Sequence, residues 1–117
     1  MEKVIIWHNP RCRKSREGLN YLKEKGIEPV IFDYLKEGIP ADELADLIKK
    51  SGLPVEAFIR SNEKEYRELG LKGKSLTAEE FARIAANHPR LLQRPIVVYG
   101  DRVVLARPAS EIDKLFT

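Results

Sequence analysis

Residues 4–34 read VIIWHNPRCRKSREGLNYLKEKGIEPVIFDY, and the spacing of their apolar residues changes twice. Residues 4–7 form a continuous apolar run before a turn at Pro10, which is typical of a buried strand. Helical spacing follows over residues 15–25, and a second β-rich run covers residues 30–34. A helix of this length can return the chain parallel to the first strand. The stretch therefore predicts a β-α-β unit with a right-handed crossover.

The middle of the chain is predicted to be helical, from about residue 41 to residue 88. Apolar residues at helical spacing precede Gly52, which suits a helix end. Thr77 and Glu80 have the spacing of a capping box, in which the side chain of each accepts a hydrogen bond from the backbone amide of the other. These signals predict a helical insertion after the opening unit.

The C-terminal part of the chain predicts a hairpin and a short helix. Two β-rich runs, residues 96–99 and 103–105, are separated by Gly100 and Asp101, a pair that suits a two-residue turn. Residues 109–116 then show the apolar spacing of a terminal helix. The whole sequence thus predicts an α/β fold with a mixed four-stranded sheet, in the order β-α-β, helical insertion and β-β-α.

Composition and charge exclude several classes of protein. Of the 117 residues, 43% are hydrophobic and 33% are charged, which indicates one globular domain over residues 1–117 rather than a disordered chain. No apolar run approaches the length of a membrane span and no signal peptide is evident, so we expect a cytoplasmic protein without membrane contacts. The net charge of +3 is too small to indicate direct binding of nucleic acid.

Cys12 is the single cysteine, which excludes an internal disulfide and metal sites built from several thiolates. It lies just before the predicted first helix, and four of the six residues 11–16 are Lys or Arg. A helix N-terminus and nearby cations both lower the pKa of a thiol, so this pattern predicts a reactive thiolate. The alternative is a small buried hydrophobic residue, which a lone cysteine often is.

Three neighbours are candidates for tuning the Cys12 thiolate: His8, Ser15 and Arg16. Ser15 stands where a C-x-x-C pair would have its second cysteine, and its hydroxyl can donate to the sulfur or simply cap the helix. An imidazolium at His8 would lower the thiol pKa, although a histidine at a strand end can equally serve a turn. Arg16 belongs to the basic cluster around the cysteine.

Three arginines at turns are candidate ligands for an oxyanion. Arg94 and Arg107 each precede a proline and flank the predicted hairpin, and Arg60 follows a short predicted turn. The planar guanidinium group binds tetrahedral oxyanions through paired N–H groups. Spacing alone does not bring the three together, and the alternative is that each is a solvated surface residue.

These residues resemble a known family. The chain reads HNPRCRKSR over residues 8–16, AFIR over residues 57–60, RPIVV over residues 94–98 and RP over residues 107–108. The ordered set is similar to that of the ArsC family, the arsenate reductases coupled to glutathione and glutaredoxin. The likeness extends over nearly the whole chain and includes the Tyr34-Leu35 pair.

The resemblance implies a thioredoxin-like fold with a helical insertion. It makes Cys12 the nucleophile and Arg60, Arg94 and Arg107 the groups that bind arsenate or a similar oxyanion. It also implies that Pro95 follows a cis peptide bond. No cofactor or metal is expected to be bound, and glutathione would act as co-substrate with glutaredoxin as partner.

Two other functions fit the same residues. The resemblance extends to Spx-like regulators, which bind the alpha subunit of RNA polymerase, although Ser15 here replaces the second cysteine of their C-x-x-C switch. The Cys12-x-x-Ser15 pattern would also suit a monothiol glutaredoxin-like exchanger that reacts with glutathione adducts.

Overall fold

A computed structural model describes residues 3–117 and divides the chain into two compact units. Unit 1 contains the chain up to Glu37 and again from Arg94 to Thr117, and unit 2 contains Gly38–Gln93. No helix within residues 3–117 is long and apolar enough to cross a membrane. The predicted α/β fold with a mixed sheet is confirmed. Its sheet belongs wholly to unit 1.

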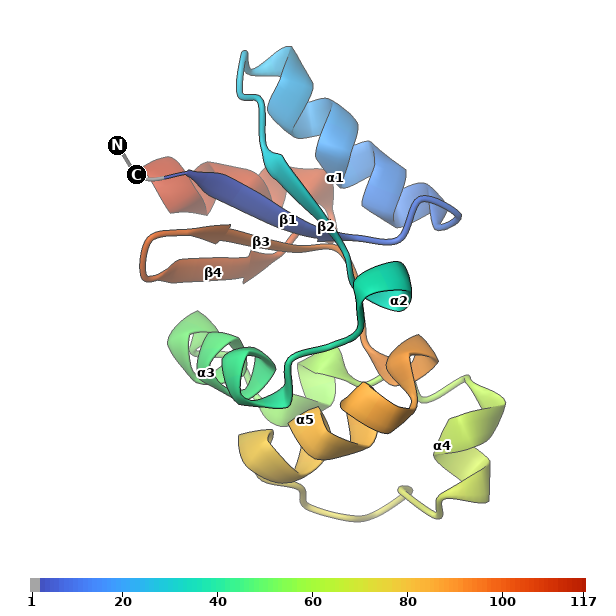
Figure 1. The fold of residues 1–117 in the computed structure, drawn as a ribbon. Helices are drawn as coiled ribbons and strands as arrows, with labels where there is room; N and C mark the ends of the chain where they lie inside the picture. The colour runs from blue at the N-terminus through green and yellow to red at the C-terminus, as the bar shows by residue number, and fades with distance from the viewer. Residues whose placement is uncertain (1–2) are drawn as a thin grey trace. The chain divides into compact units, whose positions relative to one another are not determined.

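The sheet of unit 1 has four strands in the order β2-β1-β3-β4 (Figure 1). The strands are β1 (Val4–His8), β2 (Val30–Asp33), β3 (Ile96–Tyr99) and β4 (Arg102–Leu105). β1 pairs parallel with β2 and antiparallel with β3, and β3 pairs antiparallel with β4. Both the predicted parallel crossover and the predicted hairpin are therefore present.

The helix α1 (Arg13–Glu24) and the 3₁₀-helix η3 (Ala109–Phe116) pack against each other and against the sheet of unit 1 (Figure 1). They cover a core of small and branched apolar side chains. This core contains Val4, Ile6, Leu22, Val97, Ala106, Ile112 and Leu115. The alternation of side chains along β1 places Val4 and Ile6 on this face because successive residues of a strand point to opposite sides.

Gly18 lets α1 approach the strand-turn segment at Pro95. A Cβ atom added at Gly18 would lie 2.8 Å from the Pro95 Cγ atom and 3.6 Å from the Ala106 Cβ atom. Gly18→Ala gains about 1 kcal/mol in helix propensity, but overpacking against a rigid ring costs about 1–3 kcal/mol. We expect a net loss of about 1 kcal/mol in the free energy of unfolding, measured by urea denaturation.

The matched control for this substitution is Asn20→Ala, at an exposed position of the same helix. It should leave the free energy of unfolding unchanged or raise it slightly, because alanine is the better helix former. A Gly18→Ala variant as stable as the Asn20→Ala variant would mean that the approach of α1 to Pro95 is not tight.

Three local predictions need correction. The first helix begins at Arg13 rather than Ser15, and Cys12 is its N-cap residue. Tyr34 does not extend the second strand, because it begins the short helix α2 (Tyr34–Glu37). The C-terminal helix has 3₁₀ rather than α geometry.

Unit 2 is built from helices, as predicted for the middle of the chain. Its elements are α3 (Ala41–Ser51), η1 (Val55–Phe58), α4 (Lys64–Glu68), α5 (Ala78–Asn87) and η2 (Pro89–Leu91). α3 packs against α5, and α3 ends at Gly52 in a left-handed conformation with φ of 71°. The predicted capping box at α5 is confirmed, because the side chains of Thr77 and Glu80 each accept from the backbone amide of the other.

Candidate active site

The loop that carries Cys12 is fixed by Asn9 at the end of β1. The Asn9 carbonyl accepts a hydrogen bond from the Cys12 amide, and the Asn9 Oδ1 atom accepts one from the Arg11 amide, each at 3.0 Å. Asn9 is buried, and the Cys12 carbonyl accepts from the Arg16 amide at 3.0 Å to begin α1. Cys12 is therefore held at the N-terminal end of a helix, where the helix dipole favours negative charge.

The Cys12 thiol is partly exposed and receives several hydrogen bonds. Burial by itself raises its pKa, but a hydrogen bond from the Arg94 side chain opposes this effect. The backbone amides of Ser15 and Lys14 and the charge of Arg94 lower it further, so the pKa of Cys12 lies below its ordinary value. Because the thiolate is the nucleophilic form, this environment favours reactivity at neutral pH.

Ser15 does not serve as the N-cap, and its hydroxyl has other partners than the sulfur. The side chain is fully buried, and its Oγ atom accepts from the Asn9 amide at 2.9 Å and lies 2.7 Å from the His8 Nδ1 atom. What Ser15 offers to Cys12 is its backbone amide. The hydroxyl instead ties the first turn of α1 to the end of β1.

His8 is buried, and this burial lowers its pKa. The charge of Asp33 opposes the shift, whereas those of Arg16 and Lys23 add to it. The ring is therefore neutral at neutral pH, and the imidazolium suggested by the sequence is not the form present. A neutral ring can accept a hydrogen bond from the Ser15 hydroxyl at Nδ1.

Arg16 acts on the backbone of the loop. Its Nη1 atom donates to the Pro10 carbonyl at 3.0 Å, and the side chain is otherwise exposed. This bond links α1 to the turn before Cys12. A direct effect of Arg16 on the thiolate stays a prediction.

Strand register brings Arg94 and Arg107 next to each other in unit 1. Ile96 pairs with Trp7 of β1 on one side and with Leu105 of β4 on the other, so the chain just before β3 lies beside the chain just after β1 and β4. The Arg107 Nη1 atom donates to the Arg94 carbonyl at 3.0 Å. Both arginines thus lie at the same end of the strands as the Cys12 loop, which follows β1.

The two prolines after these arginines have the same peptide geometry. The Arg94-Pro95 and Arg107-Pro108 peptide bonds are both cis. The Pro95 carbonyl accepts a hydrogen bond from the Ala106 amide at 3.0 Å.

Arg60 belongs to unit 2, where its Nη1 atom lies 2.9 Å from the Glu63 Oε2 atom. Arg90 approaches the same carboxylate, at 3.8 Å from Oε1. The Arg60 amide donates to the Leu91 carbonyl at 2.8 Å, which fixes the backbone at this position. Its predicted role as an oxyanion ligand stays a prediction.

A groove in unit 1 lies directly beside the Cys12 loop. It has a volume of about 370 Å³ and is lined by Asn9, Pro10, Arg11, Asp33, Leu35 and Lys36. Asn9 and Asp33 are not among the site residues predicted from sequence. An Asn-Pro pair after a strand is a signal for the Asx turn that Asn9 makes, whereas the position of Asp33 follows only from its pairing with His8 across the sheet.

Among residues 3–117, no cluster of His, Cys, Asp and Glu could hold a metal ion.

Comparison with known proteins identifies the family. Residues 7–115 match the model of the ArsC family. The chain is 40% identical over 112 residues to Uncharacterized protein YfgD of Escherichia coli strain K12, which covers 95% of this chain and 94% of that protein. It is also 38% identical over 110 residues to an arsenate reductase of Haemophilus influenzae. That match covers 93% of this chain and 95% of the relative.

A solved structure shows the same fold at similar identity. An arsenate reductase from Vibrio cholerae superimposes with a TM-score of 0.90 at 36% identity, over 98% of each chain. The matched region includes both units and contains Cys12 and the three candidate arginines. On the sequence match and the structural match together, the chain belongs to the ArsC family.

Proposed function

We propose that this protein is an arsenate reductase that uses Cys12 as its nucleophile and glutathione, with glutaredoxin, as its reductant. One observation carries the proposal: Cys12 is the N-cap residue of α1, its amide is held by the Asn9 carbonyl at 3.0 Å, and Arg94 and two amides of the first turn lower the pKa of its thiol. Donors in this arrangement stabilise negative charge first on sulfur and then on an oxyanion that binds beside it. The relatives named arsenate reductases support arsenate as that oxyanion.

Arg94 and Arg107 would hold the arsenate oxygens, with Arg60 as a third ligand. Arg94 lowers the pKa of the Cys12 thiol, and the Arg107 side chain is exposed and donates to the Arg94 carbonyl. Guanidinium groups bind a tetrahedral anion in fixed geometry. Binding therefore brings arsenic to the thiolate and reduces the entropy that the reaction must lose.

In the first step the Cys12 thiolate attacks As(V) and an arsenate oxygen leaves as water after protonation, so a sulfur–arsenic bond replaces an arsenic–oxygen bond. A glutathione thiolate then attacks the Cys12 sulfur. The new disulfide forms, the sulfur–arsenic bond breaks, and its electron pair reduces arsenic to As(III), which leaves as arsenite. Because Cys12 is the single cysteine, an external thiol of glutaredoxin must then release Cys12 from the mixed disulfide. Glutaredoxin takes up the glutathionyl group in this exchange, and a second glutathione attacks that disulfide, leaves as oxidised glutathione and regenerates the glutaredoxin thiol.

The groove beside the Cys12 loop supports glutathione as the thiol. Glutathione has two carboxylates and one ammonium group, and the groove presents two cations, Arg11 and Lys36, and one carboxylate, Asp33. The Asp33 Oδ1 atom accepts from the Lys36 amide at 3.2 Å, which fixes it at the groove. The charges of the groove are therefore equal in number and opposite in sign to those of the tripeptide.

We expect the double substitution Arg11→Gln and Lys36→Gln to raise the KM for glutathione about fivefold to tenfold and to leave kcat nearly unchanged. Each exposed ion pair is worth about 0.5–1 kcal/mol, and a loss confined to binding raises KM. The measurement is steady-state arsenate reduction with varied glutathione. Lys23→Gln, which removes an exposed cation of α1 outside the groove, is the control.

Dithiothreitol lacks carboxylates and separates a groove effect from a general loss of activity. The double variant should keep its rate when dithiothreitol replaces glutathione. An equal loss with both thiols would contradict a charge-based glutathione site.

Reduced glutathione is abundant in a reducing compartment, so we place the activity in the cytoplasm.

The proposal is tested by arsenite formation with the purified protein, arsenate, glutathione and glutaredoxin, with each component omitted in turn. Formation of arsenite that depends on all four would support it. Cleavage of a glutathione mixed disulfide without any turnover of arsenate would favour the monothiol exchanger. Stable binding to the RNA polymerase alpha subunit without either activity would favour the Spx-like regulator.

A further inference from the structure

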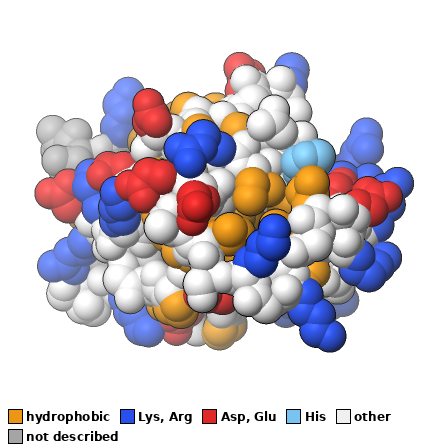
Figure 2. Space-filling view, turned by 90° about the horizontal axis from the view of Figure 1, so that it is seen from below, with side chains coloured by type: hydrophobic (Ala, Val, Ile, Leu, Met, Phe, Trp, Pro, Cys, Tyr) orange, Lys and Arg blue, Asp and Glu red, His pale blue; other side chains and the backbone are white. Residues whose placement is uncertain are grey.

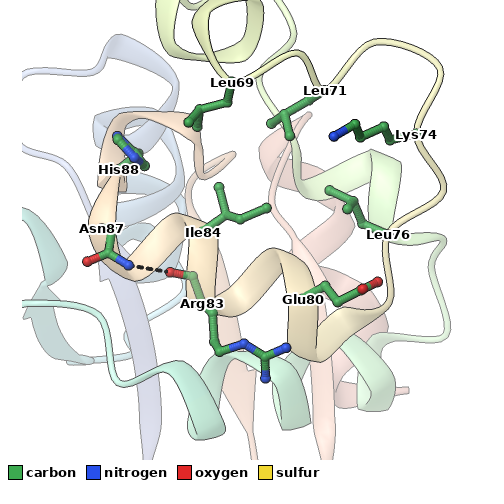
Figure 3. Close-up of a pocket in the computed structure, with 9 residues that line it drawn as sticks. All are labelled: Leu69, Leu71, Lys74, Leu76, Glu80, Arg83, Ile84, Asn87 and His88. Carbon is green, nitrogen blue, oxygen red and sulfur yellow. Dashed lines mark hydrogen bonds between the residues drawn. The ribbon is translucent and has the colours of Figure 1, made fainter.

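Unit 2 contains a cavity that plays no part in the proposed reaction. It lies between α5 and the segment that joins α4 to α5, and its volume is about 420 Å³. This volume is within the range of small-molecule sites in proteins. Figure 3 shows Ile84 of α5 pointing across the cavity toward Leu69 and Leu71 of the joining segment.

The floor of the cavity is apolar, and part of it is exposed to solvent. Leu71 is buried, whereas Leu69 is 38% exposed. Leu76 and Ile84 are half-buried. In the view from below, hydrophobic side chains gather in a patch with basic side chains and a histidine at its margin (Figure 2). A ligand with an apolar body would remove this surface from water, at about 25 cal/mol per Å².

The margin of the cavity is positively charged. Lys74 and Arg83 supply this charge, and the Lys74 side chain points from the joining segment toward the apolar floor (Figure 3). Within residues 3–117, neither Lys74 nor Arg83 forms an ion pair with a carboxylate. The one acid in the lining, Glu80, accepts a hydrogen bond from the Thr77 amide at 2.9 Å as part of the capping box.

The backbone fixes the shape of the joining segment. Gly70 and Gly73 both have positive φ, of 64° and 79°, where a side chain would be strained. The Leu71 amide donates to the Tyr66 carbonyl and the Lys74 amide donates to the Leu71 carbonyl, each at 3.1 Å. Lys74 is therefore held on a turned backbone beside the floor rather than on a free loop.

We propose that this cavity binds a small apolar carboxylate, with its hydrocarbon body over Leu69 and Ile84 and its carboxylate at Lys74. A cation beside an exposed apolar floor selects an anion over a neutral molecule of the same shape, because only the anion gains the ionic contact. The site lies within unit 2 and is independent of Cys12 and of the reaction proposed for it.

The probes are octanoate and 1-octanol, which have the same chain length and differ in charge. Each is added to the full-length ¹⁵N-labelled protein below its aggregation concentration, and amide shifts are followed by NMR. We expect saturable octanoate shifts confined to residues 69–76 and 80–88, and binding of 1-octanol about fivefold weaker. Equal affinity for the two probes would overturn the proposal, as would shifts centred on Arg94 and Arg107.

Two pairs of variants test the charge and the floor separately. Lys74→Gln should weaken octanoate about fivefold and leave 1-octanol unchanged, whereas Lys72→Gln, outside the lining, should change neither. Leu69→Gln should weaken both probes, and Leu53→Gln, at another exposed leucine of unit 2, should weaken neither. Both leucines are exposed, so these variants should fold. Equal effects within either pair would overturn the proposal.

Discussion

The Cys12→Ser variant is expected to form no arsenite above background, a loss of at least about 10³-fold in kcat. Serine cannot supply the thiolate that attacks arsenic, nor the sulfur that forms a disulfide with glutathione. Single-turnover and steady-state arsenite formation with glutathione and glutaredoxin measure the loss.

Failure to fold would not explain this result. Cys12 is the N-cap residue of α1 and makes no side-chain cap hydrogen bond. Serine is a preferred N-cap residue, so the variant should unfold at the same temperature as the wild type or a higher one. A well-folded Cys12→Ser protein with wild-type turnover would eliminate the whole reaction scheme.

The second large effect is expected for Arg94→Gln, which should lower kcat/KM for arsenate about 10-fold to 100-fold. The substitution removes a charged hydrogen bond to the Cys12 sulfur and a proposed ligand of the oxyanion. A hydrogen bond to a charged group contributes about 1.5–3 kcal/mol, which corresponds to this range of rates. The variant should also raise the pKa of Cys12, because Arg94 lowers it by both its hydrogen bond and its charge.

The pH dependence separates these two roles of Arg94. Alkylation by iodoacetamide requires the thiolate, so its rate rises as the pH increases through the pKa of Cys12. In the wild type this rise should occur below the pH of an ordinary thiol, and in the variant at higher pH. At alkaline pH the alkylation rates should converge, while arsenate reduction should stay impaired because the oxyanion ligand is still missing.

Arg13→Gln is the matched control for Arg94→Gln. Arg13 is adjacent to Cys12 in sequence, but its side chain is 85% exposed, and its Nε atom lies 3.5 Å from the Glu17 Oε1 atom. Its charge should therefore be screened by solvent and have little effect on the sulfur. Equal shifts of the alkylation profile in both variants would mean that general positive charge, rather than the Arg94 contact, lowers the pKa.

Most of the fold could be predicted because its signals are local. The apolar run before Pro10, the capping box at Thr77 and Glu80, and the Gly100-Asp101 turn each depend on residues close together in sequence. The parallel crossover then follows from the length and handedness of the connection. Residue type alone places the start of α1 two residues too late, because Ser15 is a better N-cap than Cys12. Tertiary contacts turn the Ser15 hydroxyl inward instead, to His8 and the Asn9 amide.

The sequence by itself determined the family, the order of the strands and helices, and the position of Cys12 at a helix N-terminus, since all of these depend on ordered motifs and local patterns. Only the tertiary structure decided which groups contact the sulfur and which charge His8 carries. The pairing of Trp7 with Ile96 brings the segment containing Arg94 beside the Cys12 loop. Burial at the end of β1 keeps His8 neutral. Both effects depend on distances and solvent exclusion between segments far apart in the chain, which residue spacing does not specify.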